Sequence, residues 1–189
     1  MRIQIRLVTI PQFCHASHMF TPFRCFFLVL LFIAPHSLFA QAVSPGEHPY
    51  FKALVGKWVG DGTLKDRAGD EKAIHEEWTG AVTEGATFTV SGKRRLGDES
   101  HDFSWIFSLN ASSGIWQCEY QHTGMDMPMW FEVSLSDTRA EMRTPLGDPG
   151  SELLITNTIE AGGIAGTVAH RDANGQEFIG GTVKHRRAG

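Results

Sequence analysis

Apolar and polar residues alternate with a period of two along most of this chain, from Trp58 to the last residues. Successive side chains of a β-strand point to opposite faces, so this alternation predicts strands that each bury one face. Short turn sequences such as Asp148-Pro149-Gly150 and Asn174-Gly175 separate the alternating segments. Strands joined by such short connections are antiparallel neighbours, and no helical pattern is long enough for a crossover between parallel strands.

We therefore expect an all-β fold, a single antiparallel up-and-down barrel of about nine or ten strands with a short N-terminal helical turn. The turn is expected in YFKALVG, with Gly56 as its stop. Closure into a barrel removes exposed sheet edges, and a two-sheet sandwich is the alternative. The expected inward positions are Trp58, Leu64, Ile74, Trp78, Val82, Phe88, Val90, Phe103, Trp105, Phe107, Leu109, Trp116, Cys118, Tyr120, Met125, Met127, Met129, Phe131, Val133, Leu135, Ala140, Met142, Leu153, Ile155, Ile164 and Val168.

The register of one hairpin can be predicted residue by residue. If residues 83–85 form a three-residue loop whose glycine adopts the left-handed conformation, Val82 faces Ala86 across the two strands. Every apolar partner then lies on the same face, which favours this register. The same register places Glu76 diagonal to Arg94, within reach of both long side chains. We therefore expect a carboxylate and a guanidinium close together on the inward face.

Residues 1–42 have the features of a secretory signal peptide with an upstream segment. Arg24 precedes an apolar run at residues 26–34, and Ala40-Gln41-Ala42 follows as a small-residue cleavage site. The apolar run is too short to span a membrane, and Pro35 interrupts it. The sequence therefore predicts an exported protein, either secreted or periplasmic, with no membrane span after cleavage.

The domain boundaries and the excluded partner classes follow from this leader. Met19 is a candidate true start; after removal of 1–42, residues 43–49 would form a linker and 50–189 one barrel domain. The leader carries three of the 17 Lys and Arg residues and none of the 21 acidic ones, so the remainder has a formal charge of about −7. That charge argues against nucleic acid or an anionic membrane as a partner. Cys118 is then the remaining cysteine, which excludes an internal disulfide.

The stretch Gly56-Lys57-Trp58 opens the first expected strand. It resembles the G-x-W signature of lipocalins and their relatives. The resemblance implies that Trp58 plugs the closed end of the barrel and that Gly56 helps the first strand to bend over it. It also implies that an arginine near the end of the last strand covers the indole by cation–π stacking. Arg186 and Arg187 are the candidates, and we assign Arg186.

A wider resemblance covers nearly the whole of the expected mature chain. The stretches LVGKWVGDGT, EEWTGAVTEGATFTVSGKRRL and HDFSWIFSLN resemble bacterial lipocalin-like proteins of domain-of-unknown-function family 1579. That family has no assigned activity. The resemblance therefore implies a fold and carries over no chemistry.

The leading functional hypothesis is non-catalytic binding of a small hydrophobic or amphipathic molecule inside the barrel. A barrel of this strand number can enclose one small ligand, and binding sites place a few polar groups among apolar walls. Glu76 and Arg94 are the expected polar anchors. The hypothesis includes no cofactor and no metal, and the sequence specifies no oligomeric state. The expected walls are Trp78, Phe103, Trp105, Phe107, Tyr120, Met125, Met127, Met129 and Phe131.

Four alternatives remain open. An enzyme could use Glu76 as acid or base in the same cavity, although the sequence holds no recognisable catalytic motif. A copper site could use Cys118, His122 and the methionines, but their period of two is typical of a buried strand face. A haem-binding barrel could use His170 or His185 as iron ligand, although His185 lies in the charged, surface-like context VKHRR. A filled barrel could instead bind a partner on its outer surface.

Overall fold

The computed structural model describes residues 43–65, 69–83 and 86–189. The expected leader at residues 1–42, with its candidate start Met19, lies outside the described residues. Within the described ranges, no helix is both long enough and apolar enough to cross a lipid bilayer.

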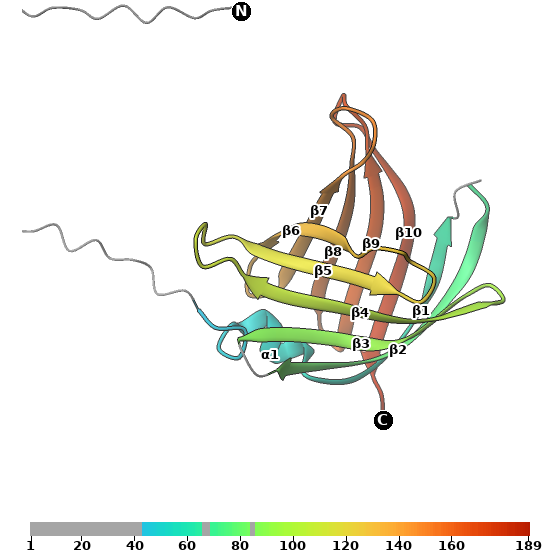
Figure 1. Ribbon diagram of the computed structural model, residues 1–189. Coiled ribbons are helices and arrows are strands. Elements are labelled where there is room, and N and C mark those ends of the chain that lie inside the picture. The colour runs from blue at the N-terminus through green and yellow to red at the C-terminus, as the bar shows by residue number, and fades with distance from the viewer. Residues whose placement is uncertain (1–42, 66–68, 84–85) are drawn as a thin grey trace, which may run out of the picture. The chain divides into compact units, whose positions relative to one another are not determined.

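Among the described residues, ten strands form one closed antiparallel barrel, and one short helix precedes the first strand (Figure 1). Each strand pairs with its neighbour in sequence, and the last strand returns to pair with the first. This arrangement confirms the predicted all-β up-and-down barrel and excludes the sandwich. The elements are α1 (Pro49–Leu54), β1 (Gly56–Lys65), β2 (Glu71–Thr83), β3 (Thr87–Leu96), β4 (Glu99–Leu109), β5 (Trp116–His122), β6 (Met129–Leu135), β7 (Arg139–Pro145), β8 (Glu152–Glu160), β9 (Gly163–Arg171) and β10 (Glu177–Arg187).

The inward faces of the strands carry apolar residues at the positions that the period of two predicts. Phe88, Phe107, Cys118, Phe131 and Met142 are each at most 3% exposed. Antiparallel pairing aligns such positions on neighbouring strands, so Phe107 lies opposite Phe88 on one side and opposite Cys118 on the other. Each large apolar side chain that is fully buried contributes about 1.5–3 kcal/mol, so this interior is the main source of stability.

The helix α1 closes one end of the barrel. His48 caps its N-terminus by accepting a hydrogen bond from the backbone N–H of Tyr50. The side chains of Tyr50, Phe51 and Leu54 are at most 5% exposed. The ring of Phe51 stacks on the ring of Phe88, with the centroids 4.9 Å apart. The helix is therefore packed into the apolar interior of the barrel.

The segment at residues 43–49, expected to be a linker, also packs at this end. Pro45 is among the fully buried side chains. The carbonyl oxygen of Ser44 accepts hydrogen bonds from the backbone N–H groups of Glu47 and His48. The segment thus forms a turn that leads directly into α1, which begins at Pro49.

Trp58 lies beside α1 at the closed end and is 5% exposed. Its Nε1 donates a hydrogen bond to the carbonyl oxygen of Leu54 at 3.0 Å, and its indole stacks on that of Trp78 with centroids 5.5 Å apart. Gly56 has a φ of 112°, a conformation that glycine adopts readily, and it connects α1 to β1. The guanidinium carbon of Arg187 lies 4.3 Å from the centroid of the Trp58 ring, which is a cation–π contact.

The arginine that covers Trp58 is thus Arg187, and the assignment of Arg186 is corrected. In the pairing of β1 with β10, Trp58 lies directly opposite Arg187, whereas the exposed Arg186 belongs to the other face of the strand. Arg187 also donates hydrogen bonds to the carbonyl oxygens of Ala53 and Val55. These bonds tie the end of β10 to the end of α1.

The hairpin of β2 and β3 differs by two residues from the predicted register. Glu76 lies directly opposite Arg94 and not diagonal to it. Thr83 pairs with Thr87, so the turn begins one residue later than expected, and Ala86 adopts a φ of 66° just before β3. A shift by an even number of residues leaves every side chain on its predicted face. The inward pattern was therefore right although the pairing was wrong.

The strand expected to carry Met125, Met127 and Met129 is shorter than the alternation predicts. β6 begins at Met129, and residues 123–128 form a connection that is not a strand. Met127 is 74% exposed, and Met125 packs against the core only in part. Pro128 has no N–H to donate to a strand ladder, which explains why the strand does not extend further towards the N-terminus.

Replacement of Arg187 by alanine is expected to lower the free energy of unfolding by about 1–2 kcal/mol, because it removes a cation–π contact and two hydrogen bonds. Arg186→Ala is the matched control, and we expect a change below about 0.5 kcal/mol. Urea unfolding followed by tryptophan fluorescence measures both variants. Equal losses in the two variants would contradict the role of Arg187 at the closed end.

Candidate ligand-binding site

The barrel contains a partly open cavity of about 240 Å³. Tyr50 and Leu54 of α1 line it at the closed end, and Leu64, Leu153 and Val168 line it further along the strands. A dry cavity of about 150 Å³ can hold benzene, and pockets for drug-sized ligands measure about 300–1,000 Å³. The cavity therefore has room for a small organic molecule.

Most of the cavity wall is apolar. Trp105, Met129, Leu153, Ile155 and Val168 line the cavity and are only half-buried, because part of each side chain faces the cavity. A ligand that covers such apolar surface gains about 25 cal/mol per Å². The wall thus offers affinity for an apolar molecule.

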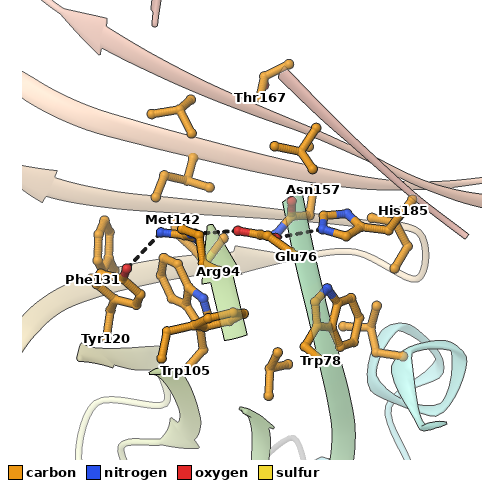
Figure 2. A pocket seen from close by; sticks show the side chains of 18 of the residues that line it. Glu76, Trp78, Arg94, Trp105, Tyr120, Phe131, Met142, Asn157, Thr167 and His185 are labelled. Carbon is orange, nitrogen blue, oxygen red and sulfur yellow. Dashed lines mark hydrogen bonds and ion pairs between the residues drawn. The ribbon is translucent and has the colours of Figure 1, made fainter. Parts of the chain in front are cut away.

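Four polar side chains form a row along the cavity (Figure 2). Glu76 is central: its Oε1 accepts a hydrogen bond from Nε of Arg94 at 2.5 Å, and its Oε2 accepts one from Nε2 of His185 at 2.8 Å. On the other side of Arg94, Nη1 donates to the hydroxyl oxygen of Tyr120 at 2.8 Å. The side chains of Glu76 and His185 are 7% and 8% exposed, and that of Arg94 is 20% exposed. We call these four residues the polar row.

Strand pairing explains how the polar row is assembled. Gly60 of β1 pairs with Glu76 of β2 on one side and with His185 of β10 on the other. A Cβ atom at Gly60 would lie 2.1 Å from Cδ2 of His185, so the absence of a side chain makes room for the imidazole. His185 thus reaches Glu76 across the backbone of β1. Arg94 lies directly opposite Glu76 on β3.

Two opposing effects act on the pKa of Glu76. Burial raises it, but the hydrogen bond from His185 and the positive charge of Arg94 outweigh burial and hold the pKa below its ordinary value of 4.5. Burial lowers the pKa of Arg94, but the charge of Glu76 outweighs this and raises it. Burial raises the pKa of the Tyr120 hydroxyl. At neutral pH the row therefore contains a carboxylate, a guanidinium and a protonated phenol.

Aromatic rings hold both ends of the polar row. Trp105 packs on Tyr120 with ring centroids 4.2 Å apart. Trp78 meets His185 edge to face with centroids 5.5 Å apart. The guanidinium carbon of Arg94 lies 5.6 Å from the Tyr120 ring centroid. Such packing restricts the rotamers of the polar side chains, so the row is preorganised.

Nine of the eleven residues predicted for the binding site line this cavity, and two do not. Met125 borders a separate surface depression beside His122, and Met127 is exposed. The assignment of these two methionines to the cavity wall is corrected, because the chain is not a strand at their positions. The nine lining residues are Glu76, Trp78, Arg94, Phe103, Trp105, Phe107, Tyr120, Met129 and Phe131.

Sequence reasoning did not assign His185 to the binding site, because its neighbours in VKHRR are charged. Lys184 and Arg186 are exposed, whereas Val183 and His185 are buried. The period of two, extended to the end of β10, would have identified the inward position of His185. The other side of the wall was not assigned to the binding site. Five of its residues were expected to point inward, namely Leu64, Ile74, Leu153, Ile155 and Val168, and it also includes Asn157 and Val183.

The arrangement of side chains offers little for the haem and copper alternatives. Nε2 of His185 is engaged with Glu76, and the exposed His170 stacks on Phe178. Cys118 is fully buried, and burial raises its pKa well above the ordinary thiol value. Over the residues that the structure describes, no group of three or more His, Cys, Asp or Glu side chains is placed to hold a metal ion.

The closed barrel with its internal cavity defines a lipocalin-like barrel. No protein-family model matches the sequence, so membership of domain-of-unknown-function family 1579 stays a prediction. No curated protein matches it significantly. Among solved structures, the chain is similar to the S-type phycobiliprotein lyase of Guillardia theta, with a TM-score of 0.53 and 10% identity over 78% of this chain and 94% of that chain. At this identity the similarity concerns the fold alone.

The loss of stability at acidic pH is expected to depend on Glu76. The pKa of Glu76 is lower in the folded protein than the ordinary value of 4.5. The ionised carboxylate therefore makes its full contribution to the free energy of unfolding above pH 4.5. This contribution is lost as the pH falls from 4.5 to the lower pKa of the folded protein. Glu76→Gln should therefore flatten the decline in the free energy of unfolding below pH 4.5. Urea unfolding at stepped pH measures this, with the exposed Glu160→Gln as a control that keeps the wild-type decline. A wild-type decline in Glu76→Gln would rule out the ion-paired carboxylate.

Proposed function

We propose that this protein binds a small, partly apolar molecule inside the barrel and does not alter it chemically. The observation that carries the proposal is an apolar cavity of about 240 Å³ whose charged side chains are gathered in one hydrogen-bonded row. In small-molecule sites, apolar walls supply affinity and a few fixed polar groups orient the ligand. The preorganised polar row and the half-buried wall residues match that division of roles.

The same geometry gives less support to an enzyme that uses Glu76 as acid or base. Both carboxylate oxygens already accept hydrogen bonds, one from Arg94 and one from His185. A general acid works best with a pKa near the working pH, whereas the pKa of Glu76 is shifted downwards. We therefore assign to Glu76 the role of holding Arg94 and His185 in place.

We also propose that the protein acts outside the cytoplasm, in the periplasm or the medium, and that it belongs with the bacterial lipocalin-like proteins of domain-of-unknown-function family 1579. The support for export is the leader pattern of residues 1–42, with Arg24, an apolar run and Ala40-Gln41-Ala42. The support for the family is the resemblance of three sequence stretches in β1, β2–β3 and β4.

Native mass spectrometry of the protein purified from its own host tests the binding function. We expect part of the protein to carry the added mass of an organic molecule, which is released on denaturation. Val168→Trp places a large side chain in the cavity from β9, and we expect this variant to lose the added mass because the space is filled.

The matched control is Thr182→Trp, which places the same side chain on an exposed position of β10 and should keep the added mass. Thermal unfolding of both variants shows whether the barrel stays folded. Wild-type protein without any added mass, or a Val168→Trp variant that is folded and carries the same mass as the wild type, would contradict binding inside the barrel.

A further inference from the structure

Arg94 has hydrogen-bond donors that the protein does not use. Its Nε donates to Glu76 and its Nη1 donates to Tyr120. A guanidinium carries more N–H groups than these two bonds require. The structure shows no further hydrogen bond from Arg94 to the described residues, so both N–H groups of Nη2 lack a partner there.

The unused donors of Arg94 are accessible to a ligand. Within the described residues, the one side-chain polar atom that is both sealed from solvent and without a partner is Nδ1 of His185. Nη2 of Arg94 lacks a partner as well. Since it is not the sealed atom, it must be accessible to solvent. Arg94 lines the cavity, and its side chain is 20% exposed. A molecule in the cavity can thus reach Nη2 without a rearrangement of the wall.

The hydroxyl group of Tyr120 provides a second donor beside the first. Arg94 can only donate, so the Tyr120 oxygen accepts in their 2.8 Å hydrogen bond and its own proton stays available. Tyr120 lines the cavity, and Trp105 fixes its ring from the side. No acceptor among the described residues takes this proton. Two donors with fixed positions therefore lie next to each other at the cavity wall.

The charges of the polar row do not oppose a ligand group that accepts hydrogen bonds and carries a negative charge. The ionised Glu76 compensates the charge of Arg94, and His185 must hold a proton on Nε2 in order to donate to Glu76. The three side chains together are neutral, or positive when Nδ1 of His185 is protonated as well. An anionic group that approaches Arg94 thus meets no net negative charge.

We propose that the ligand carries a carboxylate, which binds Nη2 of Arg94 and the hydroxyl group of Tyr120, and that its apolar part packs against Ile155 and Val168. This inference rests on the proposed binding function and adds the chemical class of the ligand. The planar guanidinium matches the geometry of a carboxylate better than an ammonium group does. Glu76 and His185 act as positioning residues, since they hold Arg94 through the carboxylate of Glu76.

Two matched pairs of probes test the inference at neutral pH. Octanoate and naphthoate carry a carboxylate, and octanol and naphthalenemethanol carry a neutral hydroxyl group on the same apolar skeletons. Isothermal titration calorimetry measures the affinity of each probe for the full chain. We expect each carboxylate to bind at least about tenfold more tightly than its alcohol, because hydrogen bonds to charged groups contribute more than neutral ones.

Two variants place the carboxylate at the predicted atoms. Arg94→Lys keeps a positive charge beside Glu76 but removes the planar guanidinium group and its Nη2 donors. Tyr120→Phe keeps the ring but removes the hydroxyl group. Each should weaken carboxylate binding by about tenfold and change alcohol binding by less than about twofold. The matched control is Arg143→Lys, which makes the same exchange next to Glu141, away from the cavity lining, and should bind all four probes as the wild type does.

Each outcome separates the inference from the proposed function. If carboxylates and alcohols bind the wild type equally well, the ligand class is wrong and the binding function stands. If none of the four probes binds, the inference fails, and the native mass spectrometry of the host-purified protein then decides whether the binding function fails as well. If Tyr120→Phe is folded by thermal unfolding and keeps the full preference for carboxylates, the anion does not bind at the polar row, and the inference is overturned even where Arg94→Lys fails to fold.

Discussion

The pairing of β10 with β1 is the constraint on which the rest of the structure depends. It closes the sheet, so that every strand has two neighbours and no strand is left as an edge. It also joins residues 109 positions apart, because Glu76 of β2 and His185 of β10 meet over Gly60 of β1. In an open sheet the carboxylate of Glu76 would lose one of its two partners, and the inward faces of the strands would be exposed to water. Barrel closure thus completes the polar row, because it brings His185 to Glu76.

The inward residues could be predicted from the sequence because a strand has a strict period of two. The neighbour relation of Glu76 and Arg94 came from the same alternation, and it survived an error of two residues in register because an even shift keeps both on one face. The prediction failed at Met125 and Met127, where the alternation continues through a segment that is not a strand. Alternation predicts faces only where the backbone is extended, and Pro128 was the signal that it is not.

His185 shows what local patterns leave out. Its charged neighbours suggested a solvent-exposed position, although its place in the alternation of β10 is inward. Its role depends on the tertiary structure, because β10 lies beside β1. It also depends on Gly60, which has no side chain and so leaves room for the imidazole. The resemblance to lipocalins implied the first of these through the arginine that covers Trp58. The choice between Arg186 and Arg187 then needed the register of β10 against β1.

The interior of this barrel is not arranged for stability alone. A buried ion pair is often no more stabilising than well-packed apolar residues of the same volume, and an unfilled cavity leaves its lining without packing partners. Here both features lie at the same place: the polar row borders the cavity of about 240 Å³, and Trp105, Ile155 and Val168 face that space. A barrel filled by its own side chains, with a function only on its outer surface, has no need for either feature. Their coincidence inside the barrel is the physical reason to look for the function there, at Arg94 and Tyr120.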